Sequence, residues 1–147
     1  MFLLYEYLES IIEDLPGIKK MYRVSSLIQL EEALSNLRDM PNCCLMVTDS
    51  GDGFLDFASR RLNTAYHTFY VFVKAGINDH ASRLAAKREA MDSAIKLIDR
   101  MRTDSTDFGM MTYGFDDSRI DYNEIGPIGN NYYGYSFGFT VKQAFAK

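Results

Sequence analysis

The sequence predicts an α+β fold in which a single domain, residues 1–147, packs helices on one face of a mostly antiparallel, twisted sheet. Three observations lead to this prediction. Apolar residues recur at helical spacing in 2–15, 26–38 and 80–103, and at strand spacing in the segments between them. Short polar turns join several of these strands as hairpins. No repeat, low-complexity tract or linker divides the chain.

The first two helices are predicted from their apolar stripes and from the residues that end them. Pro16-Gly17 stops the helix over 2–15. Ser26 and Gln29 have the spacing of a capping box and open a helix through about 38, which ends at the segment 40–42. The two stripes are Leu4, Leu8, Ile11 and Leu15, then Leu27, Leu30, Leu34 and Leu37.

Strands are predicted around and after the second helix. The segment 19–26 is a short strand, and the apolar run "CCLMVTD" (43–49) is typical of a central strand. The turn "SGDG" leads to strands in "FLDFASRRL" (54–62) and "AYHTFYVFVKA" (65–75), which the link "RRLNT" joins as a hairpin.

Asn78-Asp79 caps the longest helix, 80–103, which three further strands follow. Strands are expected in "FGMMTYGF" (108–115) and "RIDYNEI" (119–125), with a loop at "GPIGN" (126–130) and a closing strand at 131–142. The buried stripe predicted for the long helix is Ala81, Leu84, Met91, Ile95, Ile98 and Met101.

The closing strand has two unlike faces. One face is predicted to lie on the helices and the other is almost bare, with Gly134 and Gly138 four residues apart. Glycine weakens a strand, so these two require a cause. A bend or bulge, close approach by a neighbouring backbone or aromatic ring (including one from another subunit), and ligand contact are all open. The residues predicted to face the helices are Tyr133, Tyr135, Phe137, Phe139 and Val141.

Composition excludes several classes of protein. A formal net charge of −4 and a pI near 5.1 argue against nucleic-acid binding. The adjacent Cys43 and Cys44 point to opposite faces of a strand, which favours two buried free thiols in a reducing cytosol. The N-terminal segment lacks a basic leader, and no run approaches 18 apolar residues, so neither a signal peptide nor a membrane span is expected.

Motifs that carry chemistry are scarce. Neither His67 nor His80 has metal-ligand spacing, and "TDSGDG" (48–53) lacks the acidic residues that a calcium loop needs at its first and twelfth positions. "GPIGN" does not precede a helix, so it has no basis for cradling phosphate. The acidic residues Asp116, Asp117, Asp121 and Glu124 are the remaining candidate for a metal site or for acid/base catalysis.

The order of the elements resembles that of tailed-bacteriophage neck and tail-completion proteins, and especially the lambda-type tail terminator family. The matching segments are "LLYEYLESIIEDL", the strand "AYHTFYVFVKA" leading directly into "DHASRLAAKREAMDSAIKLIDRM", and "IGPIGNNYYGYSFGFTV". Proteins of this family are small, acidic and α+β, with alternating aromatic residues in the last strand. The likeness covers most of the chain, and residues 25–42 add to its simplest form.

The resemblance implies a non-enzymatic structural protein of a phage or prophage, without cofactor, metal or catalytic residues. It implies a ring, expected to be a hexamer, that caps the tail tube and joins it to the head. The partners would be like subunits and other tail or neck proteins, in the cytoplasm of the bacterial host or in a virion. Exposed loops at "SGDGFLDF", "DDSRID" and "IGPIGNN" would make the contacts. The interface residues predicted are Arg60, Arg61, Asp116, Asp117, Gly134 and Gly138.

Two other classes of function compete with this prediction. A small domain that binds a ligand or peptide would show a pocket lined by Tyr132, Tyr135 or Tyr113 and a few polar groups. An enzyme would use the carboxylates of Asp116, Asp121 and Glu124, and Mg²⁺ or Mn²⁺ would then shift its melting temperature.

Overall fold

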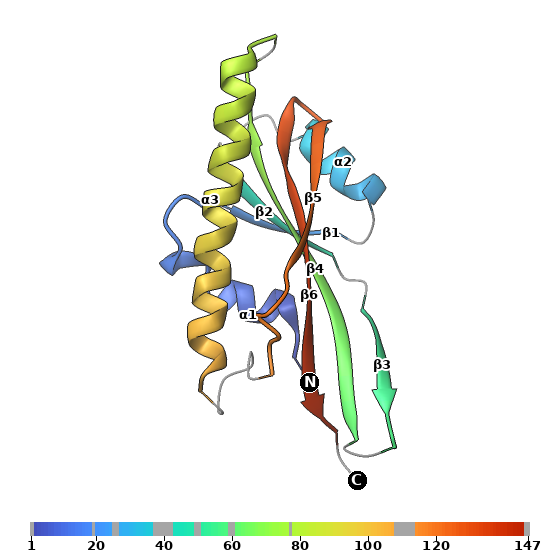
Figure 1. Ribbon diagram of the computed structural model, residues 1–147. Helices are drawn as coiled ribbons and strands as arrows, with labels where there is room; N and C mark the ends of the chain where they lie inside the picture. The colour runs from blue at the N-terminus through green and yellow to red at the C-terminus, as the bar shows by residue number, and fades with distance from the viewer. Residues whose placement is uncertain are drawn as a thin grey trace.

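The structure is a computed structural model that describes residues 2–18, 20–24, 27–36, 43–48, 51–58, 61–76, 78–107 and 114–145 (Figure 1). It has the α+β architecture that the sequence predicts. The helices are α1 (Leu4–Ile11), which a short 3₁₀ turn (Ile12–Asp14) continues, α2 (Leu27–Asn36) and α3 (His80–Ser105). The strands are β1 (Lys20–Val24), β2 (Cys43–Thr48), β3 (Asp52–Asp56), β4 (Leu62–Lys74), β5 (Asp121–Ile128) and β6 (Tyr132–Ala144).

The described strands form one sheet in the order β1-β2-β4-β6-β5, with β3 also paired to β4. Only the β1–β2 pair among them is parallel. The long strands β4 and β6 pair from Leu62↔Ala144 to Lys74↔Tyr132. On the other edge of β4, β2 lies opposite residues 69–73 and β3 lies opposite residues 62–66. Two strands, β2 and β3, therefore lie end to end along this one edge of β4.

We call the two halves of the molecule the body and the arm. The body comprises β1, β2, β5, residues 69–74 of β4 and 132–137 of β6, together with the helices. The arm comprises β3, residues 62–67 of β4 and 139–144 of β6, and extends away from α2 toward the C-terminus (Figure 1). Both halves share β4 and β6, so one pair of strands is buried in the body and reaches into the arm.

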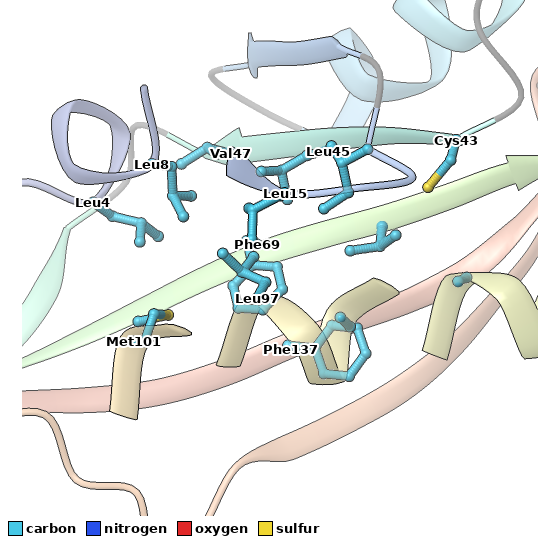
Figure 2. Packing of buried hydrophobic residues seen from close by; sticks show 14 of the residues in the cluster. Leu4, Leu8, Leu15, Cys43, Leu45, Val47, Phe69, Leu97, Met101 and Phe137 are labelled. Carbon is cyan, nitrogen blue, oxygen red and sulfur yellow. The ribbon is translucent and has the colours of Figure 1, made fainter. Parts of the chain in front are cut away.

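The larger core lies between the sheet and the helices α1 and α3. Figure 2 shows Leu97 of α3 beside Phe69 and Phe137, with Leu8 and Leu45 near the same layer. Phe69 stacks on Phe137 with their ring centroids 5.2 Å apart. The prediction that the aromatic face of β6 packs on the long helix is confirmed, because Tyr133, Phe137, Phe139 and Val141 belong to this cluster.

The predicted stripe of α3 is wrong at several positions. Leu84 and Ile95 are 47% and 49% exposed, and three of the six buried residues of α3 are alanines. The aromatic rings of β4 and β6 fill much of the space between the layers, so α3 contributes small side chains along half of its buried face and directs Leu84 and Ile95 outward. The buried residues of α3 are Ala86, Ala90, Ser93, Ala94, Leu97 and Met101.

The expectation that all helices lie on one face is wrong for α2. Leu30 and Leu34 of α2 pack on the opposite face of the sheet, against Cys44, Phe72 and Tyr132. Cys43 and Cys44 therefore lie in different cores, as neighbouring residues of a strand that is buried on both faces must. Gly129 allows α2 to approach, since a Cβ there would lie 2.5 Å from that of Leu34.

Several boundaries also differ from the predictions. The strand expected at 54–62 is β3, which begins earlier and ends at Asp56, and the helix expected over 2–15 loses its α form after Ile11. "GPIGN" is not wholly a loop, because β5 continues to Ile128 through a register shift after Ile125. At this bulge Gly126 has φ 142° and precedes a cis Pro127. Most of the strand predicted at 108–115 lies outside the described residues.

The two glycines on the bare face of β6 have different surroundings. A Cβ on Gly134 would lie 1.9 Å from the carbonyl oxygen of Val71, so close approach by the neighbouring backbone explains this glycine. A Cβ on Gly138 would have only the carbonyl oxygen of His67 at 4.0 Å, so space does not require glycine there. Close approach by a neighbouring backbone therefore explains Gly134 but does not explain Gly138.

Candidate functional site

The arm carries the largest group of exposed apolar side chains on the sheet. Phe54 and Leu55 of β3 are 52% and 54% exposed, Phe57 just after β3 is 62% exposed, and Tyr66 of β4 is 48% exposed. Phe54 and Tyr66 share one face of the β3–β4 pair and Leu55 lies on the other face, so the arm exposes apolar side chains on both of its faces. We call these four residues the arm patch.

The local sequence holds β3 close to β4 while leaving its side chains open to solvent. Gly53 pairs with Ala65, and a Cβ on Gly53 would lie 2.3 Å from the carbonyl oxygen of Thr64. Phe54 lies opposite Thr64 and its ring is 6.5 Å from that of Tyr66. Among the described strands, β3 pairs only with β4, so within the described part of the chain the other edge of β3 is open.

The tip of the arm is held by aromatic and cationic contacts. The rings of Phe57 and Phe145 meet edge to face at 5.0 Å, and the guanidinium of Arg61 lies 4.8 Å from the Phe145 ring and 5.4 Å from the Phe57 ring. The amide of Phe145 donates a hydrogen bond to the carbonyl of Arg61 at 3.0 Å. The tip is therefore ordered by its own contacts and presents Phe57 on a stable support.

A concavity of about 550 Å³ lies where the arm joins the body. Its walls are the residues before and at the start of α1, the end of β1, and the β3–β4 pair. Its rim carries Glu6 and Asp52 as well as Arg23, whose guanidinium lies 4.9 Å from the ring of Tyr5. The volume is in the range of small-molecule sites, and most of the lining is apolar.

His67 forms part of the floor of this concavity. Its ring meets Phe2 edge to face at 5.0 Å and stacks on Phe139 at 5.5 Å. The amide of Phe2 donates to Oε1 of Gln143 at 2.8 Å, which fixes the start of the chain on the arm. Burial lowers the pKa of His67, because the apolar surroundings disfavour its charged form.

The predicted interface residues fall at separate places. Arg61 lies at the tip of the arm, and Arg60 lies outside the described residues. Asp117 accepts a hydrogen bond from Nε of Arg102 at 3.1 Å, and Asp116 accepts from the Ser118 hydroxyl at 2.6 Å. Each acid thus has a partner in its own chain. The hydrogen bonds from Ser118 lower the pKa of Asp116.

A second, shallower hollow brings two predicted residues together. Gly138 and Asp116 line a space of about 280 Å³ that Arg119 and Asp121 also border. Gly134 takes no part in it, because that residue lies at the close β4–β6 contact. Gly138 therefore borders open space, which keeps partner or ligand contact as a possible reason for its lack of a side chain.

Asp116 and Asp121 both border this hollow, whereas Asp117 and Glu124 do not, so the four carboxylates near 116–124 do not form one site. Asp121 binds Nε of Arg119 at 3.0 Å and Glu124 pairs with Lys87, so each carboxylate has its own partner. The described residues contain no group of three or more His, Cys, Asp or Glu that could hold a metal ion. Burial raises the pKa of the Cys43 thiol to about 11 and that of Cys44 to about 12, which makes both poor nucleophiles.

Two of the tyrosines predicted to line a ligand pocket, Tyr132 and Tyr135, do not do so. Tyr132 is fully buried beneath α2, Tyr135 packs against Tyr122 and Phe137, and Tyr113 lies outside the described residues. The concavity found instead is formed by residues 2–6, by the end of β1 and by the β3–β4 pair. Strand alternation could not reveal it, since its walls come from segments far apart in sequence.

Comparison of the sequence with models of known protein families finds no matching family, and no curated protein matches it. Among the helices that the structure describes, none is both long and apolar enough to cross a membrane.

Proposed function

We propose that this chain is a non-enzymatic assembly protein of a tailed phage or prophage, of the tail-terminator or neck type. It acts by contacts with like subunits in a ring and with tail or neck proteins. The observation that carries this proposal is the arm patch beside an open strand edge. Exposed apolar patches and unpaired edges mark protein–protein contact surfaces in soluble proteins.

The position of the arm patch supports contact with another protein. The fold does not need Phe54, Leu55 or Phe57 for its own core, because both core clusters form without them. Their exposure is a cost to solubility unless a partner covers them. The layout that resembles the lambda-type tail terminators gives the class of partner, and the carboxylates and thiols described above give no competing enzymatic site.

A second candidate function is binding of a small apolar ligand or a peptide, and the concavity at the base of the arm favours it. Its 550 Å³ would hold a ligand of ordinary size, with Arg23, Glu6 and Asp52 as polar contacts. Such a protein would work as a monomer, and its ligand would raise the melting temperature.

Solution mass separates the two candidates. Light scattering over a range of concentrations, with negative-stain imaging of large species, should show a closed ring or its building block. A variant with Phe54→Ser and Phe57→Ser should assemble less, while Leu84→Ser, which removes an exposed apolar residue of α3, serves as the matched control. A chain that stays monomeric at every concentration would contradict the assembly function and leave the ligand-binding function.

A further inference from the structure

The open edge of the sheet has a stepped outline. Beside the body half of β4 lie two strands, β2 and then β1, whereas beside the arm half lies one strand, β3. Both β1 and β3 lack a neighbour among the described strands on the side that faces away from β4. The outline is thus a projection one strand wide next to a notch one strand wide.

We propose that two copies of this chain pair along this stepped edge, with β3 of each copy adding to β1 of the other. A half-turn about the sheet normal places the body of one copy beside the arm of the other. Three strands then lie between β4 of the first copy and β4 of the second. At one half of the edge they are β2 and β1 of the first copy, followed by β3 of the second. At the other half they are β3 of the first copy, followed by β1 and β2 of the second. The inference rests on the proposed function only in that the chain assembles with itself.

The strand directions fit this arrangement. β2 and β3 are both antiparallel to β4, and β1 is parallel to β2, so β1 and β3 run the same way in one chain. A half-turn about the sheet normal reverses the strands of the second copy and keeps the two faces of the sheet on the same sides. The new β3–β1 pairs are therefore antiparallel, and a two-fold axis makes both equal.

The faces of the side chains agree with the same symmetry. Tyr22 lies opposite Met46, which belongs to the core beneath α2, and Phe54 lies opposite Thr64, on the same face. A register that places Tyr22 of a second copy opposite Phe54 joins residues of that face. The same register places Met21 opposite Leu55 on the other face, so apolar residues meet on both.

Charge selects this pairing over the simplest alternative. In the register above, Lys20 of a second copy lies directly opposite Asp56, which gives an opposite-charge pair at each end of the interface. A symmetric antiparallel pair of two β3 strands centred on Phe54 would instead place Asp52 opposite Asp56 twice, and like charges in that position repel. The acidic ends of β3 therefore favour a basic strand, and β1 is one.

A cross-link between copies tests the pairing directly. Within one chain Tyr22 and Phe54 are six residue rows apart, counted from Tyr70 to Thr64 along β4, or roughly 20 Å at the rise of a strand. A disulfide in the variant Tyr22→Cys with Phe54→Cys can therefore form only between copies. We expect a covalent dimer under mild oxidation, since the native thiols of Cys43 and Cys44 are buried.

The matched control moves one cysteine to the other face of β3. Tyr22→Cys with Leu55→Cys places the two thiols on opposite faces and should give little covalent dimer. Equal cross-linking of the two variants, or none in either, would overturn the pairing. Near-ultraviolet circular dichroism of the reduced variants establishes that both are folded before oxidation.

A charge exchange gives a second test without new thiols. Lys20→Asp and Asp56→Lys should each weaken dimerisation roughly 2- to 30-fold, because each changes two symmetric contacts. The double variant should recover the affinity of the original chain, measured by analytical ultracentrifugation. If the cross-link does not form and the protein still assembles in every one of these variants, the pairing is wrong but the proposed assembly function stands. A cross-linked dimer that never forms larger species supports the inference and contradicts the ring function.

Discussion

The body and the arm use the same two strands in opposite ways. In the body, β4 is buried on both faces, with Phe69 and Val71 against α1 and α3 and Phe72 against α2. In the arm, the same strand carries Tyr66, which is 48% exposed, and its neighbour β3 exposes Phe54 and Leu55. The larger core reaches into the arm at Phe139 and Val141 of β6, but β3 displays apolar side chains that neither core uses.

The sequence of β4 contains this difference. Its body half reads "FYVFV" and suits burial on both faces, whereas its arm half reads "LNTAY" and mixes polar with apolar residues. A strand that changes character along its length belongs to a sheet that is covered at one end and open at the other. The comparison implies that substitutions in the body reduce stability and that substitutions in the arm reduce assembly.

The largest effect is expected from Gly134→Ala in the body. The added Cβ would lie 1.9 Å from the carbonyl oxygen of Val71, so β4 and β6 would have to separate. We expect a loss of about 4 kcal/mol or more in the free energy of unfolding, measured by urea denaturation. Gly138→Ala on the same strand is the control, since its Cβ meets open space, and a similar loss there would refute the argument.

A second pair of substitutions compares the two regions with one residue type. Leu97→Ala in α3 removes a side chain with no exposed area, and it should lower the free energy of unfolding by about 2–5 kcal/mol. Leu55→Ala in the arm removes a side chain that is 54% exposed, and should change it by less than about 0.5 kcal/mol. Denaturant midpoints measure both, and Leu55→Ala should still weaken self-association. Equal stability losses would mean that the arm is part of the core.

Much of the fold could be predicted from the sequence because its signals are local. The periodicity of α3 and β6, the Asp79 cap and the alternating aromatics are properties of neighbouring residues, and Asp79 does accept from the amide of Ser82. The face that α3 buries could not be predicted in the same way. That face depends on how much space the rings of β4 and β6 leave between the sheet and the helix. Alanines of α3 fit into this space and are buried, whereas Leu84 is exposed.

The candidate site was less predictable than the fold. "SGDGFLDF" was expected to be an exposed loop that contacts partners. Most of its described residues are exposed, but residues 52–56 form a strand. The concavity and the stepped edge depend on which strands lie side by side, and the order β1-β2-β4-β6-β5 has no signature in any one segment. The packing of α2 on the face opposite α1 and α3 also could not be predicted, because it depends on the order of the strands.

The third prediction concerns the junction between the two regions. Because burial lowers the pKa of His67 in the folded state, folding favours its neutral form. The neutral ring contributes its full stability above its unfolded pKa near 6.5, and that stability falls as pH decreases from there toward the folded pKa. Thermal melts of His67→Phe should lose this part of the pH dependence, because phenylalanine can stack on Phe139 without titrating.

The environment of His67 determines how this result is to be understood. The hollow behind its ring contains Asp116, Asp121 and Arg119, whose charges partly offset one another. A control variant, His80→Phe, replaces the exposed histidine at the start of α3 and is melted over the same pH range. If His67→Phe and the original chain have parallel melting curves across this range, burial does not govern the titration of His67.

The smallest effect is expected at Asp117, one of the predicted interface residues. Its carboxylate binds Arg102 of its own chain, and both side chains are about half exposed, so water and salt already weaken the pair. Asp117→Asn should leave the melting temperature and the sedimentation of the protein almost unchanged, with Asp56→Asn in the arm as its counterpart. Weaker assembly in Asp117→Asn but not in Asp56→Asn would place the subunit contact on the α3 side of the molecule, and the arm would then lose its assigned role.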